Sequence, residues 1–148
     1  MRAKDLMTQN PTVTAADDSI PRAAELMRNL GVGMLPVVDD LQTRRLVGAI
    51  TDRDIVVRCL ADHGTAQCRV RDHMSTSPLV FVHADTPLDD IGRKMEQYQV
   101  RRLPVVTSDL RVVGIVTQAD LAVRVGAGDP TLIEEIVQRI STPGALVH

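Results

Sequence analysis

The sequence contains almost no aromatic residues and no long apolar run. Its 148 residues include one Phe, one Tyr and no Trp, so aromatic stacking can contribute little to ligand binding. No apolar run approaches the roughly 20 residues of a membrane-spanning helix, and the N-terminal Met-Arg-Ala-Lys-Asp lacks the apolar segment of a signal peptide. We therefore expect a cytoplasmic protein with no membrane partner.

A surplus of basic residues is also absent. The chain has 17 Lys and Arg against 19 Asp and Glu, and its net charge at pH 7 is -2. A general nucleic-acid binder needs a basic surplus, because its affinity comes from releasing the counterions of the phosphates. The charge therefore does not favour a nucleic-acid partner.

Cysteine is scarce, and its spacing predicts no metal site. The two cysteines, Cys59 and Cys68, stand nine residues apart without a Cys-x-x-Cys motif. The four histidines form no cluster in the sequence, and none completes a spacing typical of zinc sites, at positions 63, 73, 83 and 148. We expect two reduced thiols, no metal and no required cofactor.

The residues that are present indicate a soluble globular protein with an internal duplication. Hydrophobic residues make up 44% of the chain and charged residues 24%, which is typical of soluble domains. Three segments recur in the same order, 67, 68 and 66 residues later. The pairs are "KDLMTQNPTV" (4–13) with "RDHMSTSPLV" (71–80), "GVGMLPVVDD" (31–40) with "QVRRLPVVTS" (99–108), and "LVGAITDRDI" (46–55) with "VVGIVTQADL" (112–121). The chain therefore consists of two copies of one unit.

The pattern of each copy predicts the element order β-α-β-β-α. Ser19 in the first copy, and Thr86 followed by Pro87 in the second, are typical of residues that begin a helix. Apolar residues then recur at helical spacing, and the "GVG" at 31–33 favours the turn that ends the first helix. Two predicted strands follow, and a second helix begins at each Thr-x-x-Asp.

The predicted fold class is α/β (α+β), with two repeats. Repeat 1 spans residues 4–60, a linker spans 61–70 and repeat 2 spans 71–125. A three-stranded sheet cannot bury both its faces in so small a unit, so we expect the repeats to pack sheet to sheet with pseudo-two-fold symmetry. A final helix is expected over 129–140, with an apolar stripe that packs on the repeats or on a second subunit. The stripe consists of Leu132, Ile133, Ile136, Val137 and Ile140.

The repeated motif, Thr51-x-x-Asp54 and Thr117-x-x-Asp120, has two interpretations. In the structural one, the two side chains form a capping box that satisfies backbone amides at the start of a helix, which is the commoner role of an isolated motif. In the functional one, the helix N-terminus and the threonine hydroxyl bind a phosphate, while the aspartate accepts from both hydroxyls of a ribose. The interpretations are compatible, because a ligand can displace a cap.

These residues resemble a known family. The order of a proline, a helix, "LPVV", a glycine with two apolar residues, and Thr-x-x-Asp is similar to a cystathionine-β-synthase (CBS) domain, and two in tandem resemble a Bateman module. The resemblance covers both copies, from residue 4 to about residue 125. It implies an adenosine-containing ligand in the cleft between the repeats, such as AMP, ADP, ATP or S-adenosylmethionine. It also implies a homodimer.

The resemblance further implies roles for individual residues. Asp54 and Asp120 would hold the ribose. Arg101 stands before "LPVV", where related modules place a basic residue that faces the phosphates, although a surface salt bridge is the alternative role. The phosphate candidates are Thr51, Thr117, Arg101 and Arg53. The adenine slot would be lined by Val13, Leu35, Pro36, Val80, Leu103 and Pro104, each of which is also a plausible core residue.

The sequence thus predicts a regulatory module that senses an adenosine-containing ligand and signals to an unknown effector protein. An enzyme is not expected, because no nucleophile, acid–base pair or metal set can be named. The alternative is a structural or interaction module that binds no nucleotide and acts through a partner protein. The two differ in whether Asp54 and Asp120 face an open cleft or only cap buried helices.

Overall fold

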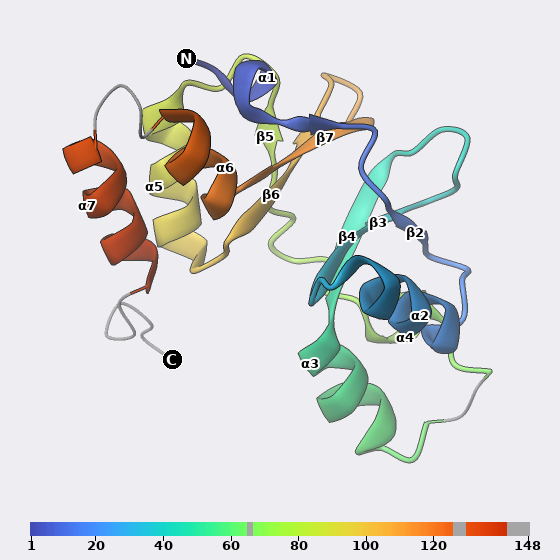
Figure 1. Cartoon of the computed structure of the whole chain (residues 1–148). Helices are drawn as coiled ribbons and strands as arrows, with labels where there is room; N and C mark the ends of the chain where they lie inside the picture. Colours follow the sequence, from blue (N-terminus) through green and yellow to red (C-terminus); the bar gives the residue numbers. More distant parts are fainter. Residues whose placement is uncertain (65–66, 126–129, 142–148) are drawn as a thin grey trace. The chain divides into compact units, whose positions relative to one another are not determined.

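The chain forms two compact units, each of which combines one β-sheet with helices (Figure 1). The computed structural model describes residues 1–64, 67–125 and 130–141. The first-repeat unit comprises residues 12–79 and 109–112, and the second-repeat unit comprises residues 1–11, 80–108 and 113–148. Neither unit is contiguous in the sequence.

The first-repeat unit is built on a three-stranded sheet with the order β2-β3-β4. Its strands are β2 (Thr14–Ala15), β3 (Met34–Val38) and β4 (Leu46–Thr51), of which β2 runs parallel and β4 antiparallel to β3. Its helices are α2 (Ile20–Leu30), α3 (Asp52–Asp54), which continues as the π-helix η1 (Ile55–Leu60), and α4 (Val70–His73). Buried and half-buried residues alternate along β4, because successive side chains of a strand point to opposite faces.

The second-repeat unit has a four-stranded sheet with the order β1-β7-β6-β5. Its strands are β1 (Thr8–Gln9), β5 (Val82–His83), β6 (Arg102–Val106) and β7 (Val112–Thr117). Its helices are α1 (Ala3–Leu6), α5 (Leu88–Tyr98), α6 (Gln118–Val125) and α7 (Pro130–Ser141). The predicted mixed α/β class and the β-α-β-β-α order of both copies are confirmed.

The segments at the start of the two copies, 1–11 and 70–79, are called the lead-in segments, and each joins the sheet of the other copy. β1 pairs antiparallel with β7, with Thr8 opposite Ile115. In the same way, Ser75 pairs with Ala49 in β4 through backbone hydrogen bonds of 2.9 and 3.0 Å. The second sheet therefore has four strands where the sequence predicts three, because pairing between distant segments leaves no local pattern.

The repeated glycine of β4 and β7 leaves room for the methionine of the incoming lead-in segment. A Cβ atom on Gly48 would lie 2.7 Å from the backbone oxygen of Ser75 and 3.2 Å from the sulfur of Met74. A Cβ atom on Gly114 would overlap the side chain of Met7. This contact explains why both the glycine and the methionine recur in the two copies.

Gly48→Ala should destabilise the protein by about 1–3 kcal/mol, because the added methyl group meets a backbone oxygen that has little room to move. Gly114→Ala should cost a similar amount, because the added methyl group would overlap the sulfur of Met7 and lie 3.0 Å from its Cβ, and side-chain rotation does not move Cβ. Urea unfolding of both variants measures the difference in free energy. Unchanged stability in either variant would contradict this packing argument.

Helix α2 begins and ends as the sequence predicts, but α5 does not. The Ser19 hydroxyl accepts a hydrogen bond from a first-turn amide at 3.2 Å, and Gly31 ends α2 with a left-handed φ of 65°. The prediction that Thr86 caps α5 is wrong, because Pro87 occupies the N-cap position. The Thr86 hydroxyl instead accepts from the amide of His83 at 3.0 Å and closes a turn before the helix.

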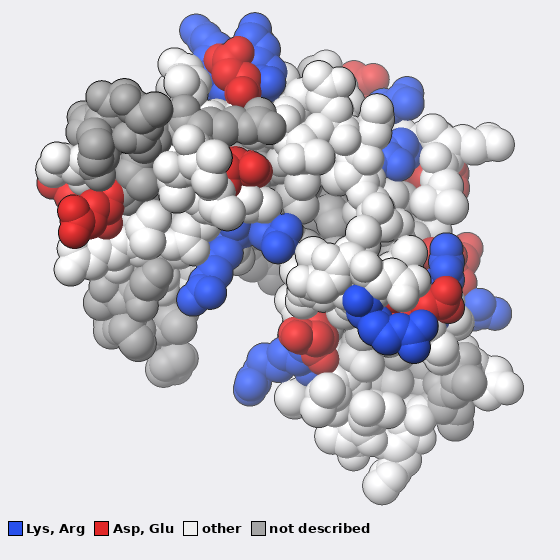
Figure 2. All heavy atoms as spheres, in the orientation of Figure 1, with Lys and Arg blue, Asp and Glu red and all other residues white. Residues whose placement is uncertain are grey.

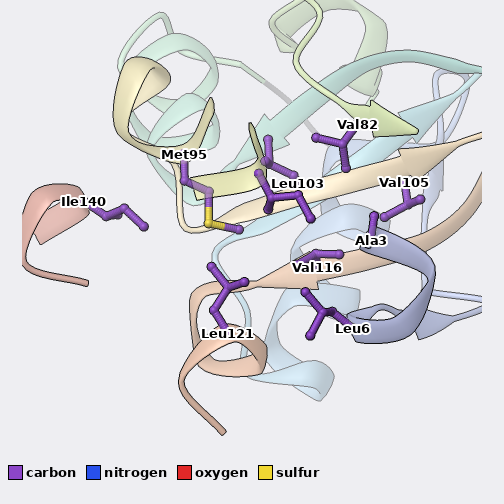
Figure 3. Close-up of a cluster of buried hydrophobic side chains, with 10 residues drawn as sticks. Ala3, Leu6, Val82, Met95, Leu103, Val105, Val116, Leu121 and Ile140 are labelled. Atoms are coloured by element: carbon purple, nitrogen blue, oxygen red, sulfur yellow. The ribbon is translucent and has the colours of Figure 1, made fainter. Parts of the chain in front are cut away.

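Each unit has its own hydrophobic core. In the first-repeat unit, Met27 of α2 packs with Leu35 and Ile50 of the sheet. In the second-repeat unit, the core draws on α1, α5, α6, α7 and the sheet, and Figure 3 shows side chains from these elements directed toward one another. Its buried members are Ala3, Leu6, Val82, Ile91, Met95, Leu103, Val105, Val116, Leu121 and Ile140.

Helix α7 covers the core of the second-repeat unit. Ile140 is only 5% exposed within this core, and the half-buried Val137 packs against it. The described part of the predicted apolar stripe therefore packs on the repeat. Residue 129 and the side chains of Leu132, Ile133 and Ile136 lie outside the described residues.

Charged residues of both signs are interspersed on the surface. On the described part of the face shown in Figure 2, Lys and Arg lie among Asp and Glu without an extended patch of one sign. One such pair joins Lys4 to Asp85 at 3.1 Å, and this hydrogen bond lowers the pKa of Asp85. Within the described ranges, the helices are too short or too polar to cross a membrane.

Candidate functional site

Both Thr-x-x-Asp motifs form capping boxes with the same geometry. In the first copy, the Asp54 amide donates to the Thr51 hydroxyl at 3.1 Å, and the Thr51 amide donates to Oδ2 of Asp54 at 2.9 Å. In the second copy, Thr117 and Asp120 make the same hydrogen bonds at the same distances, 3.1 and 2.9 Å. All four residues are half-buried. The cap uses Oδ2 of each carboxylate, and Oδ1 can accept from a further donor.

The first motif lies at the edge of the sheet where three strand ends meet. Thr51 ends β4 opposite Met34, the first residue of β3. β2 runs parallel to β3 with Thr14 beside Val37, so Val13 and the residues before it approach the same edge. The predicted ribose and phosphate residues therefore stand next to the start of the predicted adenine slot.

The corresponding edge of the second-repeat unit carries Arg101. Parallel pairing of Val82 with Val105 brings the amino ends of β5 and β6 to the edge where β7 ends. The amide of Gln118, the first residue of α6, donates to the backbone oxygen of Arg101 at 2.9 Å. The backbone thus holds the exposed Arg101 next to the N-terminus of α6 and its capping box.

The charges around the first motif differ from those around the second. Gly33 takes the place of Arg101, and its backbone oxygen accepts from the amide of Asp52 at 2.9 Å. A Cβ atom on Gly33 would lie 3.0 Å from the Asp52 carboxylate, so an acidic group fills this space. In the second copy the neutral Gln118 replaces Asp52. Coulomb interactions therefore favour a phosphate at the second motif over the first.

Two arginines lie near the first motif. Arg53 is exposed on α3, and its amide donates to the Asp52 carboxylate at 2.8 Å. Arg58 follows Asp54 by one helical turn, with its Nε atom 3.6 Å from Oδ1 of Asp54. A ribose hydroxyl must therefore compete with Arg58 for this oxygen. Arg58 is not among the residues predicted for the site, although its i, i+4 spacing from Asp54 is typical of such a pair.

The side chains predicted to line the adenine slot are mostly buried, and Leu35 and Leu103 belong to the two hydrophobic cores. The buried ones are Val13, Leu35, Pro36, Leu103 and Pro104. Leu35 is only 1% exposed, and Leu103 is 0% exposed. Val80 differs, because it is half-buried at the margin of the second-repeat core. Val80 therefore offers a base the most accessible side-chain contact of the set, and backbone groups of the strands would supply the remaining contacts.

The structure also brings together three residues that the sequence does not connect. One ligand atom each from Cys59, Cys68 and His73 lies within 4.8 Å of the other two. Burial raises the pKa of the Cys59 thiol, and the neighbouring Cys68 raises it further, whereas an activated nucleophile needs a lowered pKa. The only signal in the sequence is the order Cys-x8-Cys-x4-His, which matches no short metal motif.

The sequence profile of the CBS domain matches residues 3–60 and 70–126. Hypoxic response protein 1 of Mycobacterium tuberculosis is 34% identical to the chain, over 97% of this chain and 96% of that protein. A crystal structure of Hypoxic Response Protein I with two coordinated zinc ions is 35% identical and has a TM-score of 0.74, over 82% of this chain and 97% of that chain.

Two similar solved structures contain adenosine-based ligands. The CBS domain pair of protein MJ0100, in complex with 5′-methylthioadenosine and S-adenosyl-L-methionine, is 33% identical with a TM-score of 0.70, over 86% of this chain and 97% of that chain. CBSX2 in complex with AMP is 34% identical with a TM-score of 0.70, over 85% of this chain and 96% of that chain. Relatives of the same fold thus bind ligands that contain adenosine.

Proposed function

Because the chain belongs to the CBS-domain family and carries two copies of the domain, we propose that it is a non-catalytic regulatory module that binds an adenosine-containing ligand. The ligands of its relatives, AMP in CBSX2 and S-adenosylmethionine in MJ0100, support this chemical class. One observation carries the proposal: in the second copy, the capping box of Asp120 lies next to Arg101 at the same edge of the sheet.

The second copy offers a group for each part of such a ligand. Oδ1 of Asp120 can accept from the ribose hydroxyls, which are donors. The Thr117 hydroxyl and the first amides of α6 can donate to a phosphate, whose charge the helix dipole and the Arg101 guanidinium stabilise. Val80 offers apolar surface for the adenine at the same edge.

The first copy suits an adenosine-containing ligand without a phosphate. Asp52 places a carboxylate beside its capping box, and Arg58 already pairs with Asp54. The exposed Arg53 is a further cation next to this motif. An acidic group repels a phosphate and attracts the positive sulfonium of S-adenosylmethionine. The two copies therefore differ in ligand preference, with AMP, ADP or ATP favoured at the second.

Exposed apolar residues on the second helix of each copy support contact with an effector protein or a second copy of the chain. Val56, Val57 and Leu60 on η1 are 56%, 49% and 58% exposed, and Val123 on α6 is 78% exposed. A ligand changes such a contact only through its different affinity for the two states of the module. The same surface supports the alternative function, an interaction module that binds no nucleotide.

Thermal unfolding with added ligands tests the proposal. A fluorescent dye follows the unfolding, because the chain has no tryptophan. AMP at about 100 times its dissociation constant should stabilise the protein by ~2.7 kcal/mol, which raises the melting temperature by several degrees. 2′-Deoxy-AMP should raise it less, because it lacks one ribose hydroxyl. ADP, ATP and S-adenosylmethionine complete the series. If no ligand of the series shifts the melting temperature, the interaction module is supported instead.

A further inference from the structure

Cys59, Cys68 and His73 come from three different segments of the first-repeat unit. Cys59 lies on η1, Cys68 precedes α4, and His73 is the last residue of α4. Their ligand atoms all lie within 4.8 Å of one another, with Cys59 buried and the other two residues half-buried. Two thiols and one imidazole are a donor set that suits Zn²⁺.

The distances fit a tetrahedral ion after a small adjustment. Bonds of about 2.3 Å to sulfur and about 2.0 Å to nitrogen place neighbouring ligand atoms roughly 3.5–3.8 Å apart at the tetrahedral angle. The observed upper limit of 4.8 Å exceeds this by about 1 Å, which side-chain rotation can supply. Three protein ligands leave a fourth position for water, as in other zinc sites of this kind.

The two copies of the repeat differ at these positions in a way that points to a ligand. His73 corresponds to Leu6 in the matching segments "RDHM" and "KDLM", and Leu6 is fully buried in the core of its own unit. Cys59 likewise corresponds to Val125, 66 residues later. The fold therefore accepts a leucine at the position of His73. The first copy instead carries two residues that can coordinate a metal.

The backbone of Gly64 packs directly against the Cys59 sulfur. The Gly64 amide donates to the backbone oxygen of Cys59 at 2.8 Å, and a Cβ atom on Gly64 would overlap the sulfur. Cys59 and Gly64 also line an open apolar pocket of about 280 Å³, together with Ile20 and Ile55. The glycine thus holds the loop against the sulfur without a side chain that would occupy the space beside it.

We propose that Cys59, Cys68 and His73 bind a Zn²⁺ ion, with water as the fourth ligand. The ion joins the end of η1 to α4 and to the segment before α4, so that its binding free energy adds to the stability of this unit. The zinc ions of the related Hypoxic Response Protein I belong to that protein, and the proposal rests on the three residues of this chain. It does not depend on nucleotide binding.

The test uses the full chain, reduced and stripped of metal, with Zn²⁺ alone as the ligand. One ion per chain should bind, and the melting temperature should rise. Co²⁺ in place of Zn²⁺ should give the intense thiolate-to-metal charge-transfer absorbance that only a coordinating sulfur produces. His73→Leu and Cys68→Ser should each weaken zinc binding by more than about 100-fold, because loss of a group that merely supports a ligand already costs about 10–100-fold.

His73→Leu is the sharper variant, because Leu6 shows that the fold accepts leucine at the corresponding position. Its melting temperature without metal should match that of the wild type. His63→Leu changes an exposed histidine outside the group and should keep full zinc affinity. Unchanged zinc affinity in His73→Leu would overturn the proposal. Failure of the wild-type protein to bind zinc while both thiols are reduced would also overturn it. If air oxidation of that protein then forms a Cys59–Cys68 disulfide, the two cysteines have a redox role instead.

Discussion

Asp120→Asn should weaken the binding of AMP by about 10- to 100-fold and leave the fold intact. A hydrogen bond to a charged group contributes about 1.5–3 kcal/mol, of which a neutral amide retains only part, and each 1.4 kcal/mol changes the affinity about tenfold. The asparagine oxygen can still accept from the Thr117 amide, so the cap of α6 remains. Calorimetry measures the affinity, and the melting temperature without ligand reports on the fold.

Asp54→Asn is the matched variant in the first copy and should reduce AMP affinity much less. Asp54 makes the same capping hydrogen bonds, but it pairs with Arg58 and stands beside the acidic Asp52. In the same assay, Arg101→Ala should weaken AMP but not adenosine, because only AMP carries a phosphate. A loss of AMP binding in Asp54→Asn alone would reverse the assignment of the copies. No loss in either aspartate variant would refute recognition of the ribose by this motif.

Leu6→Ala should destabilise the protein by about 2–4 kcal/mol. Leu6 belongs to the lead-in segment of the first copy, yet its side chain is fully buried in the core of the second-repeat unit (Figure 3). Truncation leaves a cavity among residues that include Val116 and Leu121. Chemical denaturation measures the loss of unfolding free energy.

Hydrogen exchange shows which unit the Leu6→Ala cavity weakens. Amides of β6 and β7 should lose protection, and those of β3 and β4 should change much less, if the units open separately. Leu41→Ala removes a leucine that is 58% exposed and should change the stability by no more than about 0.5 kcal/mol. Loss of protection confined to β3 and β4 would contradict the exchange of lead-in segments between the copies.

Local signals predicted most helices, strands and caps, because these depend on residues that are neighbours in the sequence. The capping boxes at Thr51 and Thr117 need only residues three apart, and both formed. Gly31 ended α2 because glycine adopts a left-handed φ without strain. The wrong prediction for Thr86 has a local origin too. Its hydroxyl had a second partner within reach, the amide of His83, and that hydrogen bond formed instead of the cap.

The candidate site was predictable in its motif but not in its charge balance. The sequence places an acid and a threonine at the start of each second helix. It does not show that Arg58 pairs with Asp54 or that Asp52 fills the space left by Gly33. For Leu35 the sequence left two roles open, the adenine slot and the core, and the structure buries it in the core. These outcomes depend on which face of a strand or helix meets its neighbours.

The order of amino acids settles the duplication, the succession of elements in each copy and the position of Thr-x-x-Asp at a helix start. Caps and strand alternation arise from hydrogen bonds and side-chain periodicity within a few residues, so a short stretch of sequence contains them. The tertiary structure alone settles the exchange of the lead-in segments and the meeting of Cys59, Cys68 and His73. The exchange joins segments that are far apart in the chain. The three ligand residues are closer in sequence, but they meet only because η1 packs against α4. In both cases the free energy of contact depends on the shapes that the segments have already adopted.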